Sequence, residues 1–399
     1  MAAAAPEDPK VPMHIRDEVL EYATRTKHAV HDASSFMAEL QVQQAQYACL
    51  EWTVHFQILN KIPRPPSLAS ISYEKLANEA GVPLITLRSV LRMLITMGLL
   101  CETADGQVSH NTMSAPFVEN AHFEVWLRHV VHHTVPLFGA MVGATEKYGA
   151  SNKINETAFN VVSNTEGVSF FEHLKATPEL EHEFDLYMKS QASINSGVRA
   201  EHLLQGFAWG ALPAGSLVVD VGGGSGATAL MLARAHPGLR LVVQDQAVPI
   251  ANARAALAAE PDRAVAARVV KLAEHDFFTS QPEPERGAAV YLLRTILHDW
   301  PDVDALRILA PLARALGPGG RIVVMDMVVP APGTGSRTLE AALRQKDLAM
   351  MLTFNAKERE ADDWYRLIAQ VEPPLAIRAI KRPEGCQHSV VEISLAAEA

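Results

Sequence analysis

The spacing of apolar residues divides the chain into a helical first half and an alternating second half. Between residues 39 and 59 apolar side chains recur at helical intervals, and the prolines within residues 63–66 predict a turn or linker after them. Helical patterns continue through residues 116–210. From Ser216 onward, short apolar runs alternate with helical segments. This alternation predicts an α/β domain with a doubly wound, Rossmann-like parallel sheet covered by helices on both faces.

Seven runs rich in apolar residues predict the strands of this sheet. They are Leu217–Asp220, Leu239–Gln244, Val269–Leu272, Ala289–Leu293, Ile322–Asp326, Ile377–Ile380 and Val390–Ser394. Open α/β sheets bind ligands beyond the carboxyl ends of their strands. Polar residues that follow these runs are therefore candidates for a functional site.

A separate pattern occupies residues 73–114. A short helix ends at Gly81, and an amphipathic helix follows it with Leu87, Leu91 and Leu94 on one face. A β-hairpin is then predicted around the turn Asp105-Gly106. Helix, turn, helix and hairpin in this order are typical of a winged helix.

These patterns predict four segments along the chain. We expect a disordered start at 1–20, a winged-helix domain at 21–120, a helical connector at 121–210 and an α/β domain at 211–399.

Composition and charge narrow the functional classes. The net charge of -10 disfavours binding to nucleic acid or to an anionic membrane. The three cysteines are widely spaced and form no disulfide framework, which suits a reducing compartment. The start of the chain lacks the features of a signal peptide, and no apolar run reaches the roughly 18 residues that a membrane helix needs. We therefore expect a cytoplasmic protein without a membrane span.

The strongest motif is a glycine-rich loop between the first predicted strand and a helix. Gly222 and Gly224 allow a tight turn and let a ligand approach the main chain closely. Asp220 ends the strand, where its carboxylate would repel a pyrophosphate but suits the cationic methionine part of S-adenosylmethionine. Asp245 ends the next strand, where an acid can accept hydrogen bonds from both ribose hydroxyls. The loop therefore indicates S-adenosylmethionine as cofactor.

Two further motifs follow this loop in order, Leu297-His298-Asp299-Trp300-Pro301-Asp302 and Ala356-Lys357-Glu358-Arg359. With the loop, they resemble the motif series of plant and fungal class I O-methyltransferases, of the caffeic-acid type and the fungal polyketide type. The resemblance covers about residues 40–395. It implies S-adenosylmethionine-dependent O-methylation of a small aromatic or polyketide-type secondary metabolite. It also implies a homodimer formed through a dimerisation domain at 21–120, a substrate-binding connector at 121–210 and an S-adenosylmethionine-binding methyltransferase domain at 211–399.

The resemblance assigns roles to individual residues. His298 corresponds to the general base, and Asp326 and Glu358 to the acids that flank and orient it. The remaining correspondences concern binding: Asp276 and Phe277 on the adenine side, Arg294 near the cofactor, and Met188 and Met350 around the substrate. The chain departs from the family pattern at Glu360, which stands where a threonine is usual, and at Gln246-Ala247, where Leu-Pro is usual. Lys346 adds a cation on a helix expected to approach the substrate.

The chemistry of methyl transfer agrees with these roles. A phenol has a pKa near 10 and an ordinary histidine a pKa of about 6.5, so an imidazole can take the proton as the new bond forms. Such general base catalysis contributes roughly 10²–10⁴-fold in rate. His298 follows one predicted strand and Asp326 ends the next, so both project from the carboxyl edge of the sheet.

Less specific interpretations of the same residues remain open. His298 can be a structural histidine at a helix start, Glu358 can form a surface ion pair with Arg359, and Asp276 can be a turn residue. Met350 can belong to the core. His129, His132 and His133 are spaced for one helix face, but no acid or cysteine pattern joins them, so we expect no metal site.

Two other functions compete with methylation. A DNA-binding protein is disfavoured because the winged-helix segment carries three basic against four acidic residues. The more serious alternative is an enzyme of the same fold that binds S-adenosylmethionine but catalyses a dehydration or a pericyclic cyclisation without methyl transfer. In that case Lys346 or the sulfonium polarises the substrate. Intact His298, Asp326 and Glu358 favour methylation.

Overall fold

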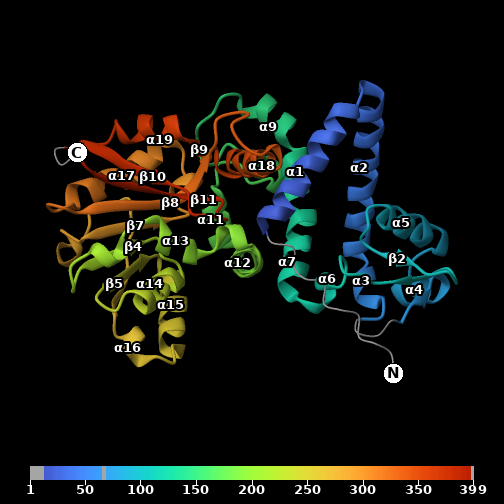
Figure 1. The fold of residues 1–399 in the computed structure, drawn as a ribbon, viewed down its shortest axis with the longest axis horizontal. Coiled ribbons are helices and arrows are strands. Elements are labelled where there is room, and N and C mark those ends of the chain that lie inside the picture. Colours follow the sequence, from blue (N-terminus) through green and yellow to red (C-terminus); the bar gives the residue numbers. More distant parts are fainter. Residues whose placement is uncertain (1–12, 65–68, 397–399) are drawn as a thin grey trace. The chain divides into compact units, whose positions relative to one another are not determined.

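The computed structural model describes residues 13–64 and 69–396, and these form two compact units (Figure 1). The first comprises the chain up to Gly139 together with Thr177–Ile194, and the second comprises Ala140–Ala176 together with the chain from Asn195 onward. The segment expected to form a connector is thus divided between the units. Residues 1–12 of the expected disordered start lie outside the described residues, whereas its remainder belongs to a helix that begins at Met13.

The first unit is mostly helical. It begins with two long consecutive helices, α1 (Met13–Val30) and α2 (Ala33–His55). Asp32 caps the start of α2, because its side chain accepts the Ser35 backbone N–H at 2.8 Å. The other helices are α3 (Ile58–Lys61), α4 (Tyr73–Ala80), α5 (Leu84–Thr96), α6 (Pro116–Glu119), α7 (Ala121–His129), the π-helix η1 (Val130–Thr134), α8 (Val135–Gly139) and α12 (Pro178–Ile194).

The predicted winged helix is confirmed and has one strand more than expected. Helices α4 and α5 are followed by the hairpin of β2 (Cys101–Glu102) and β3 (Gln107–Ser109), and β1 (Ile71–Ser72) pairs with β3. Leu87, Leu91 and Leu94 are fully buried on the inner face of α5, as their spacing predicts. The apolar side chains on this face therefore form part of the core of the small domain.

The second unit contains a large sheet with the strand order β10-β11-β8-β7-β4-β5-β6, and β9 pairs with β8 off this path. The strands are β4 (Leu217–Val221), β5 (Arg240–Asp245), β6 (Val269–Glu274), β7 (Val290–Arg294), β8 (Arg321–Val329), β9 (Arg359–Glu360), β10 (Leu375–Lys381) and β11 (His388–Leu395).

The α/β class is confirmed, but the sheet is mixed and not wholly parallel. Strand β11 runs antiparallel to both β8 and β10, whereas β4, β5, β6, β7 and β8 run parallel to one another. The physical reason is the short connection through residues 382–387, because a parallel crossover needs roughly a dozen residues or more.

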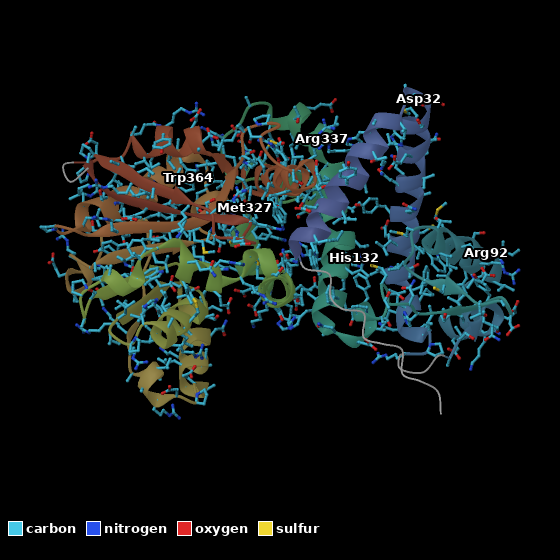
Figure 2. All side chains as sticks on the ribbon, in the orientation of Figure 1. Asp32, Arg92, His132, Met327, Arg337 and Trp364 are labelled. Atoms are coloured by element: carbon cyan, nitrogen blue, oxygen red, sulfur yellow. The ribbon has the colours of Figure 1, made fainter. Side chains whose placement is uncertain are left out.

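Alternate residues of the central strands face two separate apolar layers. Val219 and Leu293 pack into a layer with α17 (Asp302–Ala315) and α19 (Ala361–Ile368), which includes the buried Trp364 labelled in Figure 2. Val218 and Leu292 pack into the opposite layer, with α14 (Ala227–Ala235), α15 (Ala247–Ala259) and α16 (Arg263–Ala266). Figure 1 shows these two groups of helices on opposite sides of the strands. Both faces of the sheet are therefore covered, and its strand ends are left as the place for a site.

The remaining helices of the second unit connect or flank the strands. They are α9 (Met141–Tyr148), α10 (Ala158–Ser163), α11 (Phe170–Ala176), α13 (Leu203–Gly206), α14 (Ala227–Ala235), α15 (Ala247–Ala259), α16 (Arg263–Ala266) and α18 (Arg337–Phe354), with short 3₁₀ turns η2 (Ser196–Val198), η3 (Ala200–His202), η4 (Trp209–Ala211), η5 (Glu283–Glu285) and η6 (Leu297–Asp299). Within residues 13–64 and 69–396, every helix is too short or too polar to cross a bilayer.

Candidate active site

The glycine-rich loop leaves β4 and enters α14. Gly222 has a φ of +71°, and a Cβ atom there would lie 2.6 Å from Cδ1 of Ile296, so only glycine fits. Gly224 has a φ of +57°, and a Cβ atom there would meet no atom within 4 Å. The main chain at Gly224 is therefore open to a ligand.

Asp220 lies in β4 directly before this loop and is 1% exposed. Its Oδ2 is buried and has no hydrogen-bond partner within the described part of the chain. Burial raises the pKa of the carboxyl to about 7, although Arg294 lowers it. A buried carboxylate without a partner fits a cationic ligand, which is what the ammonium of a methionine moiety provides.

Asp245 ends β5 beside the loop. Its Oδ2 accepts the Gly224 backbone N–H at 2.8 Å, and its Oδ1 accepts the Gln246 N–H at 2.6 Å. Burial raises the pKa of this carboxyl, while the two backbone hydrogen bonds lower it. A carboxylate has about four acceptor sites, so Asp245 can hold the loop and still accept from ribose hydroxyls.

The expected adenine-side pair follows β6. Oδ1 of Asp276 accepts the Phe278 backbone N–H at 3.0 Å, and the Asp276 side chain is exposed. This contact is a turn contact, which was the alternative interpretation of Asp276. Phe277 is half-buried, and its ring lies 3.8 Å from a Cβ atom built on Gly222. Phe277 therefore borders the glycine loop.

Arg294 ends β7 at the same edge of the sheet. Its Nη2 donates to the Val198 carbonyl at 2.8 Å, whereas its buried Nε has no partner among the described residues. Burial lowers the pKa of the guanidinium, and Asp220 and Asp326 raise it. Arg294 therefore places a buried positive charge close to the two acids.

His298 and Glu358 form the closest contact between predicted catalytic residues. Nδ1 of His298 lies 2.8 Å from Oε1 of Glu358, and Nε2 lies 3.5 Å from Oδ1 of Asp299. The Glu358 side chain is 1% exposed and the His298 side chain 16%. Burial alone would lower the pKa of His298, but Glu358 and Asp299 outweigh it and raise the pKa to about 10. Glu358 thus fixes the ring and favours its protonated form.

Glu358 is held in turn by helix α18. Its backbone N–H donates to Oδ1 of Asp347 at 2.9 Å. The alternative of a surface ion pair with Arg359 is wrong, because Glu358 is buried against His298 and Arg359 binds elsewhere. The Lys-Glu-Arg motif therefore directs two adjacent side chains to different partners.

Within the described residues, Asp326 in β8 forms no hydrogen bond or ion pair with the His298 ring. Its Oδ2 accepts the Leu297 backbone N–H at 3.1 Å, and its Oδ1 is buried without a partner in the described residues. Burial raises the pKa of this carboxyl to about 7, while His298 lowers it. Asp326 therefore supports the turn that carries His298, and the two expected acids act at different places.

Arg359, which sequence reasoning did not assign, anchors the same turn from the other side. Its guanidinium donates to the carbonyls of Leu297 at 2.7 Å and Trp300 at 3.0 Å, and to Asp302 at 2.8 Å. The Arg359 side chain is 1% exposed. Its position next to Glu358 in the motif was the signal that could have identified it.

Trp300 continues this turn into an aromatic group. Its ring stacks on Phe171 with centroids 5.8 Å apart and meets Phe277 and Phe278 edge to face. Phe171 also stacks on Phe354 at 5.3 Å. These contacts link the histidine turn to the end of α18 and to the loop after β6.

The expected substrate-binding residues lie in both units. Lys346 and Met350 are half-buried and one turn apart on α18 in the second unit, whereas Met188 is 45% exposed on α12 in the first. Met351 is 40% exposed. The structure thus places Lys346 and Met350 on one helix, and the substrate role of all three residues stays a prediction.

His388 is a buried histidine that no motif indicated. It begins β11, is 3% exposed, and pairs in register with Met327, which Figure 2 labels. Its Nδ1 is buried and has no partner in the described part of the chain. Burial, with the nearby charges of Arg294, His298 and Lys346, holds the pKa of His388 well below its usual range.

Residues 13–64 and 69–396 contain no group of three or more His, Cys, Asp or Glu side chains placed to hold a metal ion. His129 instead stacks on Tyr187 with centroids 3.5 Å apart, and His133 lies 3.5 Å from Glu183.

A glycine-rich loop, a buried acid suited to a cationic group and a histidine–glutamate pair lie at one sheet edge, and this arrangement fits an enzyme that uses a nucleoside cofactor. The O-methyltransferase domain model matches residues 150–371. The fungal O-methyltransferase fsr2 of Gibberella fujikuroi is 51% identical over 380 residues, covering 95% of this chain and 96% of the relative. The chain therefore belongs to the O-methyltransferase family of fungal secondary metabolism, and its cofactor is S-adenosylmethionine.

Solved structures resemble the chain over most of its length. NcsB1, an O-methyltransferase from neocarzinostatin biosynthesis, was solved with S-adenosylmethionine and 2-hydroxy-5-methyl naphthoic acid. It is 26% identical, with a TM-score of 0.67, over 88% of this chain and 96% of that one. A structure described as a pericyclic reaction enzyme has a TM-score of 0.76 at 23% identity, over 96% of this chain and 95% of that one. At that identity the second likeness shows the fold alone.

Proposed function

We propose that the protein methylates a hydroxyl of a small aromatic or polyketide-type secondary metabolite, with His298 as general base. The observation that carries this proposal is the 2.8 Å contact between His298 and the buried Glu358, on a turn that Asp326 and Arg359 support from two sides. A base that is oriented by a buried carboxylate is what proton removal from a hydroxyl needs. The hydroxynaphthoic acid bound by NcsB1 supports a flat, hydroxylated acceptor.

Different residues of the chain would bind different parts of the cofactor. S-adenosylmethionine, when bound, supplies an activated methyl group on a sulfonium. Asp220 and Arg294 would hold its methionine part, and Asp245 its ribose, because each lies at the strand ends beside the glycine loop. Phe277 would border the adenine side. Asp276 remains a weaker member of this set, because its carboxylate already closes a turn.

His298 must be neutral to accept the hydroxyl proton. Nε2 is the ring nitrogen that remains for the acceptor, because Nδ1 contacts Glu358. As Nε2 takes the proton, Glu358 stabilises the imidazolium that forms. Met350 would border the acceptor, because a flexible methionine side chain fits varied apolar surfaces.

A second candidate function is a dehydration or pericyclic cyclisation in which no methyl group is transferred. Lys346 favours it, since a half-buried cation beside the site can polarise a substrate carbonyl. Incubation of protein, acceptor and S-adenosylmethionine distinguishes the two functions. Methylation produces S-adenosylhomocysteine in proportion to product, whereas the alternative produces none.

Replacing Asp220 or Asp245 with asparagine is expected to weaken the binding of S-adenosylhomocysteine. Each change removes a charge-assisted hydrogen bond worth about 1.5–3 kcal/mol, which corresponds to roughly 10- to 150-fold in affinity. Calorimetric titration measures this loss. Asp262→Asn is the matched control, because Asp262 is an exposed helix cap and asparagine caps equally well. Unchanged affinity in both site variants would overturn the cofactor assignment.

We also propose that the chain is a homodimer joined through its N-terminal helices. Helices α1 and α2 expose several large apolar side chains, namely Val19, Tyr22, Phe36, Met37 and Tyr47, more than isolated surface residues would explain.

Light scattering should therefore give twice the mass of one chain at micromolar concentration. Phe36→Asp should shift the mass toward the monomer, whereas Ile85→Asp should not, since Ile85 is 83% exposed on α5. A monomeric wild-type protein is the result that contradicts the proposal.

A further inference from the structure

The positive charge of Lys346 has no role in the cofactor binding and proton removal proposed above, although Lys346 interacts electrostatically with Glu358. Lys346 lies on α18 one turn after Leu343, which packs against Met327 and Val329 at the end of β8. This packing brings α18 to the end of β8, and Lys346 follows Leu343 by one turn of the same helix. Lys346 is half-buried, and burial lowers its pKa while Glu358 raises it.

The ammonium of Lys346 has no bonded partner within the described part of the chain. It forms no hydrogen bond or ion pair with the residues that the structure describes, and Glu358 is already engaged by His298 and by the backbone contact with Asp347. A half-buried cation that lacks a bonded partner is costly unless a ligand supplies one. The position therefore fits an anionic group from outside the chain.

His388 provides the independent observation. His388 is only 3% exposed, and its Nδ1 has no hydrogen-bond partner among the described residues. It lies opposite Met327 in the β11–β8 pair. The charged groups with the largest effects on it are Arg294, His298, Lys346 and His202, and all of them act as positive charges. The charges that act most strongly on His388 are thus positive. The acids Glu358, Asp299 and Asp326 act instead on His298.

We propose that Lys346, on the helix that packs against the end of β8 where the buried His388 pairs, forms a subsite for a carboxylate on the acceptor, so that the substrate is a hydroxylated aromatic acid. The proposal rests on the proposed methylation, because the acid group would hold the acceptor with its hydroxyl toward His298. A charge-assisted contact to Lys346 would then select acids over neutral phenols of the same shape.

The test compares two probes that differ only in the acid, 3-hydroxy-2-naphthoic acid and 2-naphthol. Their binding is measured by calorimetry in the presence of S-adenosylhomocysteine. We expect the wild-type protein to bind the acid about 10- to 100-fold more tightly than the naphthol. Lys346→Met should abolish this preference and leave naphthol affinity within about twofold, and Lys346→Arg should retain part of it.

Arg337→Met is the matched control, because Arg337 is an exposed cation at the start of the same helix (Figure 2), nine residues and therefore about 14 Å from Lys346. It should keep the full preference for the acid. Equal binding of the two probes by the wild-type protein would overturn the subsite. So would a Lys346→Met variant that weakens both probes equally, or one that weakens only S-adenosylhomocysteine.

Two further outcomes separate the possible failures. If Lys346→Met shifts only the pH dependence of methylation, Lys346 acts through Glu358 and the subsite is wrong. If the wild-type protein prefers the acid through Lys346 yet forms no S-adenosylhomocysteine with any acceptor, the subsite stands and the proposed methylation fails.

Discussion

His298→Ala is expected to lower turnover by roughly 10²–10⁴-fold while leaving S-adenosylhomocysteine affinity within about twofold. The imidazole is the group placed to accept the hydroxyl proton, and its ring contacts are with Glu358 and Asp299 and not with the glycine loop. Single-turnover assays measure the first quantity and calorimetry the second. Asp326→Asn should cost less, because Asp326 acts on the backbone of Leu297 and leaves the ring in place.

The pH dependence supplies a second measurement in the same experiment. Glu358 and Asp299 raise the pKa of His298 to about 10 in the ligand-free protein, against the effect of burial. The neutral base form therefore increases as pH rises, and wild-type turnover should rise with it. The turnover of His298→Ala should also rise toward pH 10, because a phenol then ionises in solution and no longer needs a base. Full turnover by the variant at pH 7 would show that His298 is not the base and would favour the non-methylating function.

Local apolar patterns allowed most elements to be predicted, but not the direction of every strand. The run Val390–Ser394 was identified as a strand, and β11 contains it. Its antiparallel direction depends on the connection through residues 382–387, which is too short for a crossover helix. Because the sequence already shows this short connection between the two strand runs, the antiparallel direction of the last strand could have been predicted from it.

The side-chain contacts within the site could not be predicted from the motifs alone. Motif order brought His298, Asp326 and Glu358 to one strand edge, but it could not say which acid reaches the ring. That choice depends on side-chain length and backbone direction: the longer Glu358 reaches His298 Nδ1, whereas Asp326 reaches only the Leu297 N–H. His388 belongs to no motif, and only the pairing of β11 with β8 places it near the site.

Arg359→Met is expected to destabilise the protein by about 3–5 kcal/mol, the largest stability loss that the site predicts. The guanidinium is almost fully buried and satisfies the carbonyls of Leu297 and Trp300 together with Asp302. Methionine fills a similar volume but donates nothing, so two carbonyls beside the histidine turn lose their donors. Chemical denaturation monitored by circular dichroism measures the change in the free energy of unfolding.

The control for this change is Arg366→Met, seven residues further along the chain. The Arg366 side chain is 70% exposed and bonds only Asp363 among the described residues, so its loss should leave stability almost unchanged. Lysine at position 359 should restore only part of the stability, because a single ammonium cannot reproduce the planar fork that reaches three acceptors. Equal stability of Arg359→Met and Arg366→Met would contradict the anchoring role. If Arg359→Met folds, its turnover should fall while cofactor affinity stays, since the turn that carries His298 would lose one of its two supports.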